Sequence, residues 1–237
     1  MDIAENVAAV KAQLAEAERA AGRTPGEVRL VAASKMNDAA RVRAAIAAGI
    51  AICGENRVQE MLEKNEQNAY AGAELHFIGH LQKNKVKNVV GAAKLIQSVD
   101  SSDLLAVISR VAEAKGIVQD VLLEVNIGRE ASKSGFFAEK LLPALDAAEL
   151  LQGVRVRGLM AIPPVCASAD DIRPYFEQMH QLFVDIGEKK YDNSTMDFLS
   201  MGMTHDFRVA VLCGSNMVRV GTGIFGERDY SRQTQCN

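Results

Sequence analysis

The segment VRLVAASK, residues 28–35, contains the unbroken apolar run of residues 30–33 and ends in a serine and a lysine. A continuous apolar run of this length is typical of a buried strand in a parallel sheet. Seven further runs rich in Val, Ile and Leu follow it. The eight runs span residues 28–34, 50–53, 75–79, 95–99, 121–126, 154–162, 198–203 and 217–222. The chain is therefore predicted to contain eight strands.

Amphipathic or alanine-rich segments lie between these runs and predict helices. They span residues 38–48, 58–65, 85–90, 102–115, 138–151, 169–189 and 205–212. Asp38 and Ser102 are the expected N-caps of two of these helices. Pro143 lies inside another, which should therefore start late or kink.

Strands that alternate with helices predict a parallel sheet with right-handed crossovers. Eight such units close into a (β/α)8 TIM barrel, for which about 250 residues is typical, and the chain has 237. We expect a single α/β domain over residues 1–237. The predicted helix over residues 2–21, within the N-terminal segment 1–22, would lie outside the barrel repeat. An open doubly wound sheet is the alternative arrangement.

Composition and charge argue against several classes of protein. Apolar residues make up 48% and charged residues 24% of the chain, which is the mix of a soluble globular protein. No stretch of about 18 apolar residues occurs, and the acidic residues near the N-terminus do not fit a signal peptide. A net charge of −3 argues against a broad basic face for nucleic acid. We therefore expect a cytoplasmic protein that binds neither membranes nor nucleic acids.

Cysteine and histidine spacing predicts no metal site. The spacing of the four cysteines fits neither a metal-binding pair nor a disulfide scaffold; they are Cys53, Cys166, Cys213 and Cys236. His76 and His80 are the one close pair of histidines. No carboxylate or cysteine follows them at the spacing of metal ligands.

The lysine at the end of the first run is the first candidate for chemistry. Functional groups of such barrels gather at the carboxyl ends of the strands, and Lys35 directly follows the first run. Partial desolvation there would lower the pKa of its amine and make it a nucleophile. The alternative is a lysine that marks the end of the strand and extends to water.

A candidate anion site lies at the other end of the chain. The loops after strands seven and eight often bind phosphate in these barrels. Ser200 and the residues after it precede a predicted helix, Gly221 allows a close approach of the backbone, and Thr222 adds a hydroxyl donor. Two ordinary tight turns are the alternative. Residues 221–226 also match GxGxxG, but we reject a dinucleotide site because only eleven residues follow.

A lysine amine and a phosphate site together point to pyridoxal 5′-phosphate (PLP), the cofactor that needs both. Arg219 lies two residues before Gly221 and shares its face of the predicted strand. An arginine cannot accept a proton, so Arg219 would keep the pyridine nitrogen unprotonated and make the ring a poorer electron sink. The alternative for Arg219 is an ion pair inside the barrel.

Seven motifs carry a resemblance to a known family. They are ASK (33–35), GENRVQE (54–60), HFIGHLQKNK (76–85), SKSG (132–135), GLMAIP (158–163), LSMGM (199–203) and VRVGTGIFG (218–226). In this order, over residues 28–228, they resemble the YggS/PROSC family of PLP homeostasis proteins. That family is itself similar to the barrel domain of alanine racemase and of bacterial ornithine decarboxylase-type enzymes.

The resemblance implies a role for each matching residue. Lys35 would form a Schiff base with PLP, and Asn56 would lie beside the cofactor. Arg219 would lie near the pyridine nitrogen, and the phosphate-binding groups would be Ser200, Gly221 and Thr222. The chain departs from the family pattern at Arg57, where an aromatic residue is usual, and at Met36-Asn37-Asp38, after the lysine.

The resemblance implies a protein that holds PLP for intracellular vitamin B6 homeostasis, with apo PLP enzymes as candidate acceptors and no catalytic residues. Racemase-like enzymes carry a second domain that this chain lacks, so we expect a monomer. The alternative is a PLP-dependent amino-acid racemase with His80 or His205 as its second base. A third reading is a barrel that binds another phosphorylated metabolite, with Lys35 as a counter-ion.

Overall fold

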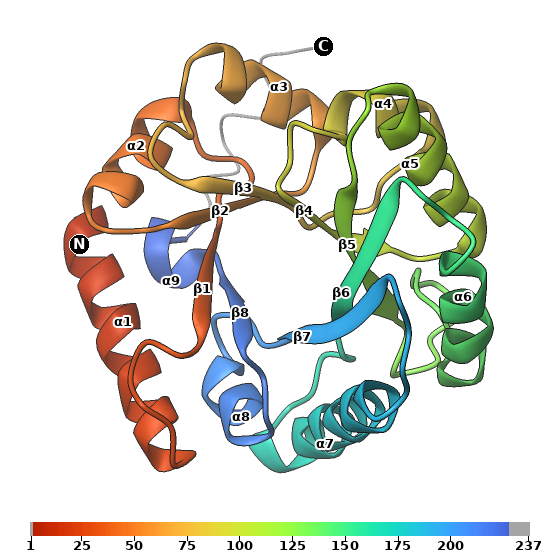
Figure 1. The fold of residues 1–237 in the computed structure, drawn as a ribbon. Helices are drawn as coiled ribbons and strands as arrows, with labels where there is room; N and C mark the ends of the chain where they lie inside the picture. The colour runs from red at the N-terminus through yellow and green to blue at the C-terminus, as the bar shows by residue number, and fades with distance from the viewer. Residues whose placement is uncertain (1, 228–237) are drawn as a thin grey trace.

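The computed structural model describes residues 2–227, which contain a closed barrel of eight parallel strands in the order β1 to β8. The strands are β1 (Arg29–Ala33), β2 (Ile52–Glu55), β3 (Glu74–Phe77), β4 (Leu95–Val99), β5 (Gln119–Val125), β6 (Val154–Ala161), β7 (Ser194–Ser200) and β8 (Met217–Val220). β8 pairs with β1, with Leu30 opposite Val218, and closes the barrel. The predicted TIM barrel is confirmed, and the open sheet is excluded (Figure 1).

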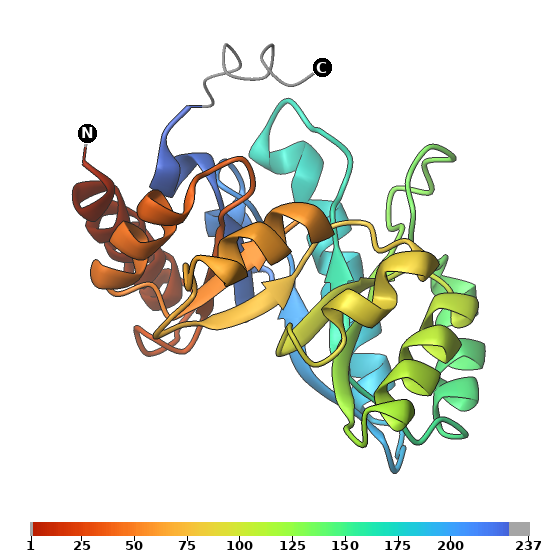
Figure 2. The same cartoon turned by 90° about the horizontal axis from the view of Figure 1, so that it is seen from above.

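Helices surround the barrel on its outer side (Figure 1). They are α1 (Ile3–Ala20), α2 (Ala39–Ala47), α3 (Val58–Glu66), α4 (Val86–Val89), α5 (Ser102–Ala114), α6 (Leu141–Ala148), α7 (Ala169–Gly187), α8 (Phe207–Leu212) and α9 (Thr222–Phe225). Two 3₁₀ turns, η1 (Lys83–Lys85) and η2 (Ala138–Lys140), precede α4 and α6. In Figure 2 the loops that follow the strands lie at the top, so this end is the mouth of the barrel.

Several predicted boundaries were wrong. Strand β7 begins at Ser194, four residues before the predicted start, and β2 ends at Glu55 rather than at residue 53. The N-cap of α5 is Ser101, whose hydroxyl accepts a hydrogen bond from the Leu104 N–H; Ser102, the predicted cap, is the first helical residue. Asp38 caps α2 as predicted, and the helix that contains Pro143 starts late, at Leu141.

Helix α1 completes the ring of helices. α9 has only four residues, and α1 packs against α8, α9 and α2 beside it. The Asn6 side-chain amide donates a hydrogen bond to the Ile224 carbonyl at 3.0 Å, and Glu16 pairs with Arg208 of α8. The N-terminal helix is thus outside the eight repeats, as predicted, but it covers the wall where the eighth unit has only a short helix.

The interior of the barrel holds two kinds of side chain. One group is apolar and consists of Val31, Ile52, Leu95, Leu122, Met160 and Met217. The other group is polar and fully buried, and consists of His76, Gln97, Ser200 and Arg219. Barrel interiors are usually filled by branched apolar residues, so this polar group is unusual.

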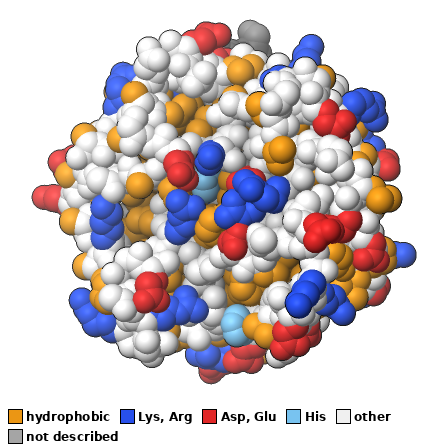
Figure 3. Space-filling model, viewed as in Figure 1, with side chains coloured by type: hydrophobic (Ala, Val, Ile, Leu, Met, Phe, Trp, Pro, Cys, Tyr) orange, Lys and Arg blue, Asp and Glu red, His pale blue; other side chains and the backbone are white. Residues whose placement is uncertain are grey.

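Charged side chains close the end of the barrel at which the strands begin. Figure 3 shows this end, with Lys, Arg, Asp and Glu side chains gathered over its centre. The guanidinium groups of Arg29 and Arg157 lie 5.2 and 5.4 Å from the centre of the Phe198 ring. Arg157 also pairs with Asp120 and Asp197. Access to the interior is therefore expected from the opposite end, the mouth.

Over residues 2–227, the structure has no helix that is long and apolar enough to span a membrane.

Candidate functional site

A pocket of about 470 Å³ opens at the mouth of the barrel. This volume lies within the range of small-molecule sites, about 300–1,000 Å³. Three of the predicted site residues line it together: Lys35 after β1, and Gly221 and Thr222 after β8. The rest of its wall consists of Ala33, Met36, Asn37, Asp38, Arg41, Arg57, Glu60, Phe225, Gly226 and Glu227. The first and last strands are neighbours in the closed barrel, which explains why residues 186 positions apart meet here.

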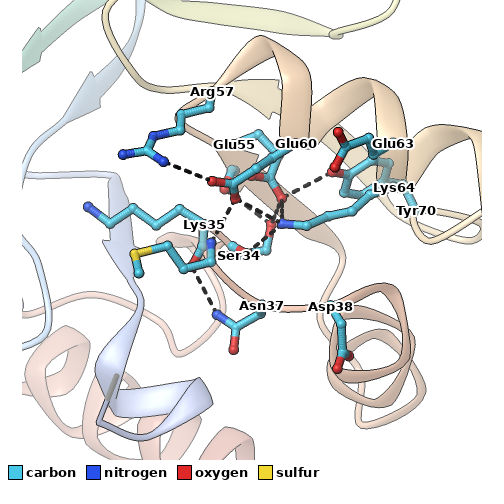
Figure 4. Close-up of polar contacts among 12 residues, drawn as sticks. Ser34, Lys35, Asn37, Asp38, Glu55, Arg57, Glu60, Glu63, Lys64 and Tyr70 are labelled. Carbon is cyan, nitrogen blue, oxygen red and sulfur yellow. Dashed lines mark hydrogen bonds and ion pairs between the residues drawn. The ribbon is translucent and has the colours of Figure 1, made fainter. Parts of the chain in front are cut away.

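A buried cluster of charged and polar groups holds the backbone next to Lys35. The Glu55 carboxylate is fully buried, and its Oε1 accepts hydrogen bonds from Ser34 Oγ at 2.5 Å, Lys64 Nζ at 2.7 Å and Tyr70 OH at 3.0 Å. Lys64 Nζ also donates to the Ser34 carbonyl at 2.8 Å. In Figure 4 the Lys64 amine points into this cluster, whereas the half-buried Lys35 side chain points away from it. The cluster thus fixes the backbone that carries Lys35.

The residues after the lysine form a turn that is held by α3. Met36 has a φ of 63°, which is unusual for a residue with a side chain. Its N–H donates to Glu60 Oε2 at 2.7 Å, and the Asn37 amide donates to the Lys35 carbonyl at 3.1 Å. Because Glu60 also lies 3.5 Å from Lys64 Nζ, the turn and the buried cluster form one unit. Glu60 therefore holds the backbone of the turn directly after Lys35.

The Glu55 carboxylate also shapes the acid–base behaviour of its neighbours. Burial raises the pKa of the Cys53 thiol to about 12, and the negative charge of Glu55 adds to this shift. The pKa of the Tyr70 phenol is raised in the same way, by burial and then by Glu55. Both groups stay protonated at neutral pH, so Tyr70 is held as a hydrogen-bond donor to the carboxylate.

Asn56 lies at the end of β2, beside the supporting cluster. It does not line the pocket, but its Oδ1 is buried and has no hydrogen-bond partner. Buried polar atoms are rarely left unpaired in folded proteins. A polar group of a bound ligand would supply the missing partner, so this atom is consistent with a ligand site nearby.

Arg219 and Ser200 lie in the barrel interior rather than on the pocket wall. Arg219 is 4% exposed and donates to Ser200 Oγ at 2.6 Å and to the Ala161 carbonyl at 2.9 Å. Burial lowers the pKa of its guanidinium to about 10, whereas the charges of Glu124 and Asp206 raise it. Arg219 therefore stays cationic at neutral pH. The Ser200 hydroxyl also donates to Gln97 Oε1 at 2.7 Å, and its predicted contact with a phosphate stays a prediction.

The turn after β8 provides the candidate anion site. Residues 221–223 enter α9, and the Gly223 N–H donates to Thr204 Oγ1 at 3.3 Å. First-turn N–H groups of a helix have no partner within the helix. The sequence alone indicates no role for Thr204. Its hydroxyl faces this turn because the loop after β7 lies beside it, a contact that only the closed barrel reveals.

Glycine at position 221 is required by neither backbone conformation nor packing. Its φ is −110°, and a Cβ there would lie 3.4 Å from the Ala33 carbonyl oxygen, an ordinary contact. Since the residue lines the pocket, the missing side chain leaves space in the pocket. Gly79 is different, because a Cβ there would lie 2.2 Å from the Asn56 carbonyl oxygen.

The two histidines considered as second bases are both exposed. His80 is 60% exposed in its side chain, and its Nδ1 lies 3.1 Å from Asp100 Oδ2. His205 is exposed at the start of the α8 segment. Neither lines the pocket that contains Lys35. Within residues 2–227, no group of three or more His, Cys, Asp or Glu side chains is arranged to hold a metal ion; Cys236 lies outside the described residues.

Comparison with known proteins places this geometry in a family. Residues 6–229 match the model of the alanine racemase N-terminal domain. The pyridoxal phosphate homeostasis protein of Aquifex aeolicus is 41% identical over 230 residues, which are 97% of this chain and 100% of the relative. The protein of the same name from Pseudomonas aeruginosa is 42% identical over 231 residues, 96% of each chain.

A solved structure agrees with these matches. PipY of Synechococcus elongatus with PLP bound is 33% identical, with a TM-score of 0.82 over 94% of this chain and 100% of that chain. The motifs quoted above had predicted this relationship. The chain therefore belongs to the family of pyridoxal phosphate homeostasis proteins, which is built on the alanine racemase N-terminal domain.

Proposed function

We propose that this chain binds PLP reversibly as a Schiff base on Lys35 and serves PLP homeostasis rather than the turnover of a substrate. The observation that carries the proposal is that Lys35 and the Gly221–Thr222 turn line the same pocket. The relatives named as PLP homeostasis proteins, and the relative solved with PLP bound, support it.

Each part of the site has a role that follows from its chemistry. When bound, PLP would supply an aldehyde that reacts with an amine. The Lys35 amine would form the C=N bond with loss of water, and water would reverse the reaction. Thr222 and the backbone at Gly221 would hold the phosphate, and Arg219 would face the pyridine nitrogen as a donor.

The residues present fit this cofactor. The buried Asn56 Oδ1 lacks a partner, and the missing side chain at Gly221 leaves room beside the turn. Arg219 uses two of the five N–H groups of a guanidinium for Ser200 and Ala161, so three are left for other acceptors. We also propose a cytoplasmic, single-domain monomer that passes PLP to apo PLP enzymes.

The phosphate part of the proposal is tested by a change at Gly221. Wild-type protein should bind PLP much more tightly than pyridoxal, which lacks the phosphate. Gly221→Ala should fold normally but lose about tenfold or more in PLP affinity, because its methyl group occupies the space beside the turn. Titration of the visible absorption of the bound cofactor gives both affinities.

Gly79→Ala is the matched control. Its Cβ would meet the Asn56 backbone, so it should lower the unfolding temperature, which Gly221→Ala should not. Equal binding of PLP and pyridoxal by the wild-type protein would contradict the phosphate site.

The absence of turnover is tested by hydrogen exchange. In deuterated water, the PLP-loaded protein should exchange the α-hydrogen of added alanine much more slowly than about 1 s⁻¹, which is the lower end of typical enzyme turnover rates. The physical reason is that His80 is 60% exposed and lies against Asp100, and His205 is exposed, so neither is held in place as a base, whereas a positioned base contributes about 10²–10⁴-fold. Proton NMR follows the exchange, with free PLP as the control. Exchange at rates of an ordinary enzyme would support the racemase instead.

A further inference from the structure

A column of three side-chain hydrogen bonds crosses the barrel interior from Arg219 to His76, and the His76 ring faces Glu74 beyond it. Arg219 Nη1 donates to Ser200 Oγ at 2.6 Å, and Ser200 Oγ donates to Gln97 Oε1 at 2.7 Å. Gln97 Nε2 lies 3.0 Å from His76 Nδ1, and His76 Nε2 lies 3.5 Å from Glu74 Oε2. The four strands β8, β7, β4 and β3 each contribute to this column, which runs from the mouth towards the closed end.

The donors in this column all point in one direction. Arginine has no acceptor, so Ser200 Oγ must accept from it, and the serine hydrogen is then available to Gln97. The Gln97 amide nitrogen can only donate, so His76 Nδ1 accepts and the ring hydrogen lies on Nε2, towards Glu74. Burial lowers the pKa of His76 to about 3, with a further contribution from Arg29, so the ring is neutral. Such aligned bonds polarise one another.

The column is not required to fill the barrel. Its four central side chains are between 0 and 4% exposed, in a space that branched apolar residues usually occupy. Buried polar groups cost free energy unless they are hydrogen-bonded. Here each polar group bonds to the next, and the last bond is made to the Arg219 guanidinium. A purely structural role would be met more simply by apolar packing, as the neighbouring cluster around Leu95 and Met217 illustrates.

The electrostatic surroundings explain why Arg219 needs to be held. Glu124 at the end of β5 and Asp206 before α8 both act on its charge. A flexible arginine near two carboxylates would turn towards either of them. The bonds to Ser200 and to the Ala161 carbonyl fix two corners of the guanidinium plane. Gln97 in turn fixes the Ser200 hydroxyl as an acceptor towards Arg219, and His76 fixes the Gln97 amide.

We propose that Gln97 and His76 are positioning residues, which hold the Arg219 guanidinium in the orientation in which it meets the pyridine nitrogen of bound PLP. This inference rests on the proposed function. Neither residue contacts the pocket, so both act through Ser200. The expected consequence is that the absorption spectrum of bound PLP depends on residues buried in the middle of the barrel.

The experiment compares two glutamine variants with the same substitution. In Gln97→Leu, Ser200 loses its acceptor, so its hydroxyl can turn and the bond that orients Arg219 Nη1 is weakened. Gln119→Leu is the matched control, because Gln119 is a buried glutamine at the closed end whose bonds go to Gly91 and to the carbonyls of Ala93, Lys94 and Asp120. Each protein is loaded with PLP, and the absorption maximum and the dissociation constant are measured. Gln97→Met replaces Gln97→Leu if the latter does not fold.

We expect Gln97→Leu to shift the absorption band and to weaken PLP binding about tenfold, the cost of one misplaced charged hydrogen bond. Borohydride should still fix the cofactor on Lys35. Gln119→Leu should lower stability without changing the spectrum. His76→Leu should behave like Gln97→Leu, and His76→Asn should restore the wild-type spectrum, because an asparagine Oδ1 can accept where Nδ1 did.

The experiment separates a failure of the proposed function from a failure of the positioning role. A wild-type protein that binds no PLP would overturn the proposed function and this inference with it. A PLP-loaded Gln97→Leu protein whose spectrum and affinity match those of Gln119→Leu would overturn the positioning role alone.

Discussion

A Lys35→Ala variant is expected to fold as the wild type does and to lose all covalently bound PLP. The side chain lines the pocket and points away from the buried Glu55 cluster (Figure 4), so its removal should change the stability of the apo protein by less than about 1 kcal/mol. Without the amine, no C=N bond can form, and the variant can hold PLP only through its phosphate and ring.

Mass spectrometry after borohydride reduction measures this loss. The wild-type protein should gain one pyridoxyl group, and Lys35→Ala should gain none. Lys83→Ala is a suitable control, because Lys83 is an exposed lysine that pairs with Asp103 at 2.7 Å. An apo Lys35→Ala protein that unfolds under conditions where apo wild type is folded would show that this residue belongs to the core instead.

A Lys64→Met variant is expected to be about 3–5 kcal/mol less stable than the wild type, because it leaves the buried Glu55 carboxylate without its cation. Lys64 and Glu55 side chains are only 7% and 0% exposed. The variant also removes the bond from Lys64 to the Ser34 carbonyl, so the turn that carries Lys35 should loosen and PLP affinity should fall. Denaturant unfolding of the apo protein gives the change in stability.

Two further variants test the cause of this effect. Lys83→Met breaks an exposed pair, 53% and 80% exposed, and should leave the stability almost unchanged because water and salt screen such pairs. The double variant Lys64→Met/Glu55→Gln removes both buried charges and should recover part of the lost stability. If Lys64→Met and Lys83→Met were equally stable, the buried pair would not support the site.

The barrel could be predicted from sequence because its strands are buried on both faces. Stretches such as residues 30–33 are then apolar throughout, and the number of such runs indicates the closed fold. The start of β7 was missed for the opposite reason. Thr195 and Asp197 are polar, and Asp197 pairs with Arg157 of the neighbouring strand β6, a partner that lies 40 residues away in the chain.

The candidate site was predictable in part. Lys35 and the Gly221–Thr222 turn each directly follow a strand, and the rule that sites gather at the carboxyl ends brings them together. The residues that hold Lys35 and Arg219 in place could not be predicted from this rule. Lys64 lies on α3 and looks like a surface lysine in sequence, yet it is buried because its helix packs over Glu55. Ser200 and Gln97 are 103 residues apart and meet only across the closed barrel.

The most direct test of the account is a crystal structure of the wild-type protein soaked with PLP. The account predicts continuous electron density from Lys35 Nζ to the cofactor, with the phosphate against the turn of residues 221–223 and the pyridine nitrogen towards Arg219. Density for PLP at another lysine, or with its phosphate away from that turn, would contradict it.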